Sequence, residues 1–115
     1  MVTDEPLDWN ALRENCAGDE SLVNEVLELF RQEAEALIAD VRVAVKNGDA
    51  LTIKRTAHRL KGALVSLGAR PSVEAARALE IAGTSNDVAA CMALFERLES
   101  ELARLMKIVS MPTAA

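Results

Sequence analysis

The only histidine of this 115-residue chain, His58, lies in the segment "TAHRLKG" at residues 56–62, with a lysine three residues later and a glycine four residues later. A neutral imidazole is a good nucleophile near pH 7, because its ordinary pKa is about 6.5. Positive charges nearby favour the neutral ring. Four cationic residues lie within four positions of His58: Lys54, Arg55, Arg59 and Lys61. If the ring takes up a phosphoryl group, Lys61 is placed one helical turn away to hold the phosphate oxygens.

The glycine and the helical pattern around it support the same chemistry. On a wheel of about 100° per residue, the apolar residues of this segment fall about 140° from His58, which predicts that the ring faces away from the core. The same wheel puts Gly62 and Val65 on the His58 face. A mid-helix glycine costs about 1 kcal/mol relative to alanine, so Gly62 calls for a steric reason, such as room for a phosphate or for a partner's loop.

The same residues fit nucleic-acid binding, metal binding and hydrolase chemistry less well. Residues 50–73 carry five Lys or Arg and no Asp or Glu, whereas the rest of the chain carries eight bases and all eighteen acids, and the net charge is −5. A short basic patch on an acidic body, without aromatic stacking residues, argues against nucleic-acid binding. One histidine without nearby carboxylates does not make a metal site. A hydrolase would need a serine or cysteine paired with this base, and the sequence identifies no such pair.

The elements that must position His58 are all helices. Hydrophobic spacing and capping residues predict five segments: a short one at about 8–16, and four longer ones at about 20–46, 49–67, 71–83 and 88–109. The turn "NGD" at 47–49 is too short for anything but an antiparallel partner. We therefore expect an all-α fold, an antiparallel four-helix bundle with a short additional N-terminal helix. It forms a single domain over residues 1–115, with the bundle at about 19–109 and a frayed tail at 110–115.

Composition indicates the cellular compartment in which we expect this domain to work. Cys16 and Cys91 lie in no CxxC or Cys/His grouping, so we interpret both as reduced packing residues of a cytoplasmic protein. No apolar stretch approaches the roughly 20 residues of a membrane span, and the acidic start of the chain is unlike a signal peptide. Met1 slightly favours a free-standing protein over a domain of a longer sensor kinase.

The segment "AHRLKGALVSLGA" at residues 57–69 resembles the signature of histidine-containing phosphotransfer (HPt) domains, Ala-His-x-Leu-Lys-Gly followed after five residues by Gly-Ala. The resemblance extends to "LELF" and "NGDA" before it and to "RALE" at 77–80, and so covers nearly the whole chain. It implies a four-helix bundle that carries phosphoryl between receiver aspartates of a two-component phosphorelay. Ser72 departs from the family, which usually has a leucine there to pack the fourth helix.

The resemblance also implies roles for individual residues. His58 is the phosphoacceptor, through Nε2; Lys61 steadies the phosphate; and Gly62 gives steric clearance. Glu80 falls where the family often has a glutamine or another polar residue, which bonds the other ring nitrogen and holds the tautomer and orientation of the ring. A carboxylate there raises the basicity of His58 and so opposes the cations.

The implied partners are response-regulator receiver domains and a hybrid sensor histidine kinase, with Mg²⁺ expected on the receiver and no cofactor on this chain. Lys54, Arg55 and Arg59 are candidates for steering an acidic partner, and Val65 for docking it. We expect a monomer that acts as a phosphocarrier without kinase activity, because no ATP-binding domain fits in 115 residues. One alternative stays open: a helical module that docks on receiver domains without carrying phosphate.

Overall fold

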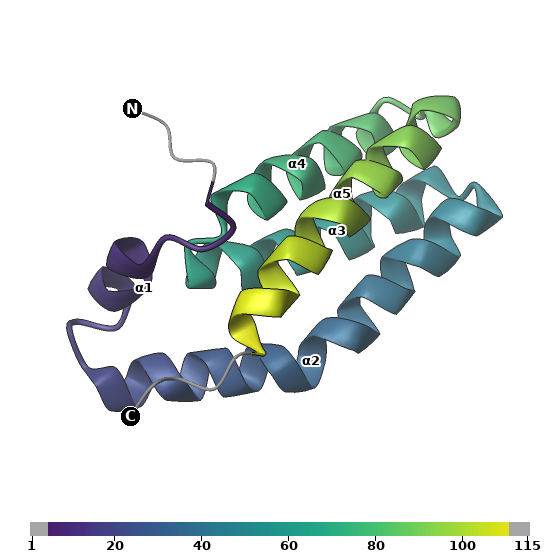
Figure 1. Ribbon diagram of the computed structural model, residues 1–115. Coiled ribbons are helices and arrows are strands. Elements are labelled where there is room, and N and C mark those ends of the chain that lie inside the picture. Colours follow the sequence, from purple (N-terminus) through teal and green to yellow (C-terminus); the bar gives the residue numbers. More distant parts are fainter. Residues whose placement is uncertain (1–4, 111–115) are drawn as a thin grey trace.

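The computed structural model describes residues 5–110, which form five helices and no strand (Figure 1). The helices are α1 (Trp9–Asn15), α2 (Glu20–Asn47), α3 (Ala50–Leu67), α4 (Arg70–Thr84) and α5 (Val88–Val109). Helices α2 to α5 pack as an antiparallel bundle, and α1 packs at one end against α2 and α3. The predicted all-α bundle with an extra N-terminal helix is confirmed. The part of the predicted tail at 111–115 lies outside the described residues.

Aspartates and glycines set the helix boundaries, as the sequence predicted. The carboxylates of four N-cap aspartates accept backbone N–H groups of the first turns of α1, α2, α3 and α5: Asp8, Asp19, Asp49 and Asp87. Gly48 and Gly68 end α2 and α3 with φ of 65° and 73°, a region that favours glycine. Helix α4 has no side-chain cap, but Pro71 in its first turn lacks the N–H that would need one.

The apolar row of α3 forms the centre of the core. Its five members have no exposed surface: Ile53, Ala57, Leu60, Leu64 and Leu67. Burying each of the larger side chains stabilises the fold by about 2 kcal/mol. Because this row holds α3 in one rotational setting, the opposite face of the helix, which carries His58, must point to solvent. Both cysteines are buried free thiols, as expected for packing residues.

Helix α4 approaches α3 unusually closely because glycine stands at the contact. A Cβ on Gly83 would lie 3.0 Å from the backbone oxygen of Ala50 and 3.0 Å from the backbone nitrogen of Lys54. These distances are tighter than nearly all real Cβ contacts, and the atoms met are backbone, so a side chain here would force the two helices to shift apart. The two backbones are therefore in close contact near this end of the helix pair. The close approach brings the middle of α4 within side-chain reach of the middle of α3.

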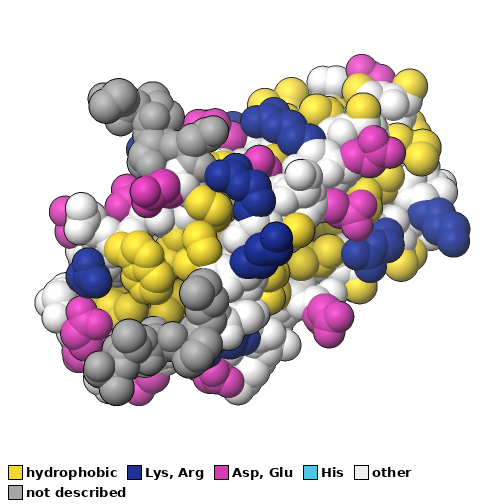
Figure 2. Space-filling view, viewed as in Figure 1, with side chains coloured by type: hydrophobic (Ala, Val, Ile, Leu, Met, Phe, Trp, Pro, Cys, Tyr) yellow, Lys and Arg dark blue, Asp and Glu magenta, His cyan; other side chains and the backbone are white. Residues whose placement is uncertain are grey.

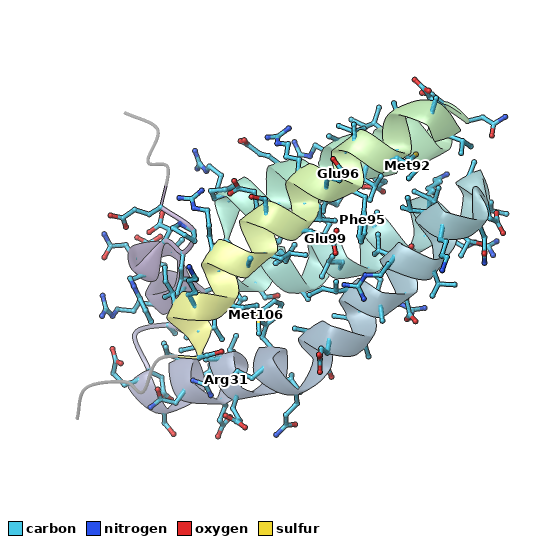
Figure 3. The ribbon with its side chains drawn as sticks, turned by 45° about the vertical axis from the view of Figure 1, so that its right-hand side comes forward. Arg31, Met92, Phe95, Glu96, Glu99 and Met106 are labelled. Carbon is cyan, nitrogen blue, oxygen red and sulfur yellow. The ribbon has the colours of Figure 1, made fainter. Side chains whose placement is uncertain are left out.

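On the other side of the bundle, α2 and α5 are held by polar contacts. The Arg31 side chain of α2 lies beneath the end of α5 and donates to the backbone oxygen of Val109 at 2.7 Å (Figure 3). Arg42 of α2 pairs with Glu99 of α5 at 3.2 Å. A groove of about 540 Å³ runs between the two helices, lined by Ile38, Met106 and others. This face shows no histidine surface (Figure 2).

The buried hydroxyl of Ser72 in α4 lowers the stability of the fold. The side chain has no exposed surface, and its oxygen has no hydrogen-bond partner among the described residues. We expect Ser72→Ala to raise the free energy of unfolding by about 1 kcal/mol, because it removes the desolvation cost of an unpaired hydroxyl. Ser100→Ala, at an exposed site of α5, is the matched control for the gain in helix propensity alone, about 0.5 kcal/mol. Urea unfolding measures the stability of both variants. Equal gains in the free energy of unfolding would contradict the desolvation cost that we assign to the Ser72 hydroxyl.

Candidate functional site

His58 lies in the middle of α3 with its ring on the surface of the bundle. Its side chain is 67% exposed, and Nδ1 lies 2.7 Å from Oε2 of Glu80 on α4. An ionised carboxylate can only accept hydrogen bonds, so Nδ1 must carry the proton of this contact. In the neutral ring, Nε2 then holds the lone pair. The contact therefore leaves Nε2 unbound by the Glu80 carboxylate, on a ring that is mostly exposed.

Glu80 also binds Lys61, which the sequence had assigned only to the phosphate. Lys61 Nζ lies 2.6 Å from Oε1 of Glu80, so the two oxygens of one carboxylate serve two residues of α3. The side chains of Glu80 and Lys61 are only 17% and 20% exposed, in contrast to His58. The result is a compact cluster between α3 and α4 in which Lys61 and Glu80 are mostly buried and the imidazole is mostly exposed.

The electrostatics of Glu80 follow from these contacts. Partial burial favours the neutral carboxyl group, but hydrogen bonds from Lys61 and His58 outweigh it and lower the pKa of Glu80 below its ordinary value of 4.5. At neutral pH the group is a carboxylate. The cluster thus contains one permanent anion, one lysine cation and one imidazole that can change its charge.

Gly62 is exposed beside this cluster, four residues after His58. A Cβ built at this position meets no atom within 4 Å. Within the described chain nothing occupies the space that the missing side chain leaves open, in contrast to Gly83. Packing inside the bundle therefore does not explain this glycine.

The remaining predicted residues surround His58 on α3. Lys54 and Arg55 are exposed. Arg59 is exposed as well and lies 3.8 Å from Asp40 of α2, a loose surface pair that contributes little to stability. Val65 is 52% exposed. All four side chains lie on the exposed side of α3 with His58, and for Val65 the helical wheel predicts this position.

Sequence reasoning missed two exposed apolar residues near the site, Leu51 on α3 and Ile81 on α4. Their side chains are 54% and 58% exposed. Leu51 precedes His58 by seven residues, as Val65 follows it by seven, and that spacing places all three on one helix face. The seven-residue spacing within α3 is therefore enough to predict that Leu51 lies on the His58 face. Ile81 follows Glu80 directly, but its exposure depends on how α4 is rotated against α3.

Charge is divided unevenly over the bundle. Residues 50–84, which include α3 and α4, carry six Lys or Arg and two Glu, and the rest of the chain carries seven bases and sixteen acids. The histidine face therefore belongs to the cationic half of an acidic protein. Such a separation accelerates the approach of an acidic partner to that face at low ionic strength.

Residues 5–110 contain neither a metal-ligand cluster nor a membrane-spanning helix. They hold no group of three or more His, Cys, Asp or Glu side chains that could bind a metal ion. None of the five helices is both long enough and apolar enough to cross a membrane.

Comparison with protein families identifies the family to which the chain belongs. The family model of the Hpt domain matches residues 25–107, which include α3, α4 and the whole cluster. The chain belongs to the Hpt domain family. This Hpt protein is accordingly a histidine phosphotransfer protein of two-component phosphorelays, a class of phosphocarriers rather than kinases. No curated protein matches the sequence.

Solved structures share the fold of this Hpt protein. Histidine-containing phosphotransfer protein B (HptB) from Pseudomonas aeruginosa PAO1 superposes with a TM-score of 0.84 at 24% identity, over 93% of each chain. The HPT domain of an Hpt sensor hybrid histidine kinase from Shewanella superposes with a TM-score of 0.63 at 17% identity, over 92% of this chain and 97% of that one. At these identities the likeness concerns the bundle architecture.

The lowered pKa of Glu80 predicts how its contribution to stability varies with pH. A carboxylate whose pKa is lower in the folded state stabilises the fold above its unfolded pKa, here 4.5, and that contribution is lost as the pH falls through the folded value. We expect Glu80→Gln to be less stable than wild type at about pH 6, with a difference that shrinks between about pH 5 and pH 3. Urea unfolding across this range tests it, with Glu96→Gln on the exposed side of α5 as the control. A stability difference between wild type and Glu80→Gln that grows as the pH falls would contradict the predicted direction.

Proposed function

We propose that His58 is the phosphoacceptor of this Hpt protein and that Nε2 is the attacking atom. The observation that carries the proposal is the 2.7 Å contact between Nδ1 and Glu80, combined with an exposed ring. The contact assigns the ring proton to the inner nitrogen, so the outer nitrogen has a lone pair directed toward an incoming partner. Glu80 is then the residue that fixes the tautomer and orientation of the ring.

The transfer itself conserves atoms and charge. The Nε2 lone pair forms the P–N bond while the P–O bond to the receiver aspartate breaks, and the aspartate leaves as a carboxylate. Nδ1 keeps its proton throughout, and the positive charge that develops on the ring is stabilised by the Glu80 carboxylate. Because the phosphorylated ring stays protonated at Nδ1, it remains a good leaving group, and the reverse steps deliver the phosphoryl group to another receiver.

Lys61 and Gly62 serve the phosphoryl group on either side of the ring. The lysine ammonium has three N–H donors, so it can keep Glu80 and still donate to a phosphate oxygen. Gly62 leaves open the space that an in-line approach requires. In-line transfer depends mainly on such positioning, because the phosphoryl group itself needs little covalent help from the protein.

The partners in this proposal are receiver domains, including one attached to a hybrid sensor histidine kinase, which supply the aspartate and Mg²⁺. Lys54, Arg55 and Arg59 steer the acidic receiver pocket toward His58. Val65, Leu51 and Ile81 provide the apolar contacts around the ring. The protein acts as a cytoplasmic monomer, with no cofactor and no kinase activity of its own.

His58→Gln should abolish phosphotransfer without disturbing the fold, because the side chain is mostly exposed and the chain has no other histidine. The measurement is incubation with a ³²P-labelled receiver domain, followed by the stability of the label: acid-labile and base-stable on wild type, absent on the variant. Circular dichroism controls for folding. Transfer that persists in the variant would refute His58 as the acceptor. Equal receiver affinity and equal signalling output from both proteins would favour a helical module that docks on receivers without carrying phosphate.

Gly62→Ala should separate stability from function. Because the added methyl group meets no atom of the protein, we expect the free energy of unfolding to rise by about 1 kcal/mol through helix propensity. Phosphotransfer from a receiver should slow at least about tenfold, since 1.4 kcal/mol of steric obstruction suffices for that factor. Ser100→Ala, which stabilises α5 far from the site, should leave transfer unchanged. A stabilised Gly62→Ala with wild-type transfer would refute the clearance role.

A further inference from the structure

The contact between His58 and Glu80 creates a conflict that the phosphoacceptor role must resolve. A carboxylate beside an imidazole favours the protonated ring, because it attracts the positive charge. The protonated ring has no lone pair and cannot attack phosphorus. Glu80 therefore orients His58 at the risk of disabling it near neutral pH.

Lys61 removes that conflict by its position. Its ammonium group lies 2.6 Å from one oxygen of Glu80, while His58 Nδ1 lies 2.7 Å from the other. The lysine and the glutamate are both largely shielded from solvent, so their charges compensate each other more strongly than those of an exposed pair. Seen from the ring, the pair is a hydrogen-bond acceptor with little net charge.

We propose that Lys61 acts on His58 through Glu80 before any phosphate arrives, as a positioning residue that neutralises the carboxylate and so keeps the oriented ring unprotonated. This inference rests on the proposed role of His58 as phosphoacceptor. It gives Lys61 a second role in the unphosphorylated protein, distinct from its contact with the phosphate.

Among residues 5–110, no other cation is placed to take this role. Lys54, Arg55 and Arg59 lie within one turn of His58 on α3, but among the described residues none of them contacts the Glu80 side chain. From α2, Asp40 faces this region and pairs with Arg59 at 3.8 Å. On α4, Arg77 lies one turn before Glu80 and forms no hydrogen bond or ion pair within residues 5–110.

The decisive comparison is Lys61→Met against the double variant Lys61→Met/Glu80→Gln. The single variant leaves an uncompensated carboxylate, which should favour the protonated ring and lower its neutral fraction at pH 7 about threefold. The double variant replaces the charged pair by an uncharged amide whose carbonyl still accepts from Nδ1. It should restore the neutral fraction and the Nδ1–H tautomer to near wild-type values, although it still lacks the lysine.

¹⁵N chemical shifts of the His58 ring report both the protonation state and the tautomer, in the isolated protein and without any phosphodonor. The result therefore stands apart from the test of phosphotransfer: a chain that fails to accept phosphoryl can still give the expected shifts, and the reverse. Arg77→Met is the matched control, since it removes one cation from the same face without contact to Glu80. It should change the neutral fraction by less than half as much as Lys61→Met.

Lys61→Arg, which keeps the charge and can still reach the carboxylate, should resemble wild type and provides a readout if the methionine variant does not fold. The inference is overturned if Lys61→Met leaves the neutral fraction unchanged or if the double variant is no closer to wild type than the single one. It is also overturned if Arg77→Met has the same effect as Lys61→Met, because the effect would then be general electrostatics rather than action through Glu80.

Discussion

One carboxylate between α3 and α4 joins His58 and Lys61, the two polar side chains of α3 that it contacts. Glu80 receives the imidazole on one oxygen and the lysine ammonium on the other, at 2.7 and 2.6 Å. Through its contact with Nδ1, Glu80 of α4 determines the tautomer of the His58 ring on α3. The arrangement depends on α4 standing at a fixed distance from α3, and the backbone contact at Gly83 sets that distance.

Much of this structure could be predicted from the sequence because the relevant signals are local. Helix boundaries followed from aspartate caps and glycine ends, and the outward direction of His58 followed from the apolar row on the opposite side of α3. The same wheel placed Val65 beside the ring. Each of these features depends on one helix and its termini, where spacing in the chain translates directly into geometry.

The contacts between helices were harder to predict, and the Lys61–Glu80 pair shows why. Its two residues are nineteen positions apart and meet only because α4 adopts one rotation and one axial shift against α3. The family resemblance implied a partner for the ring at Glu80, but not that the same carboxylate also holds Lys61. Ser72 is a similar case. The sequence shows that Ser72 stands where the family usually has a leucine, but only the structure shows that its hydroxyl is buried without a partner among the described residues.

The glycine contact between α3 and α4 also limits how this chemistry could be moved to another protein. Residues 57–62 supply the histidine, the lysine and the open space, yet the inner ring nitrogen has no partner without an acceptor, here an acid, at the correct height on an adjacent helix. A recipient scaffold would need two antiparallel helices close enough for their backbones to touch one turn beyond that acid. In most helical pairs ordinary side chains hold the axes farther apart, so a transplanted segment would present an imidazole with no partner for its inner nitrogen.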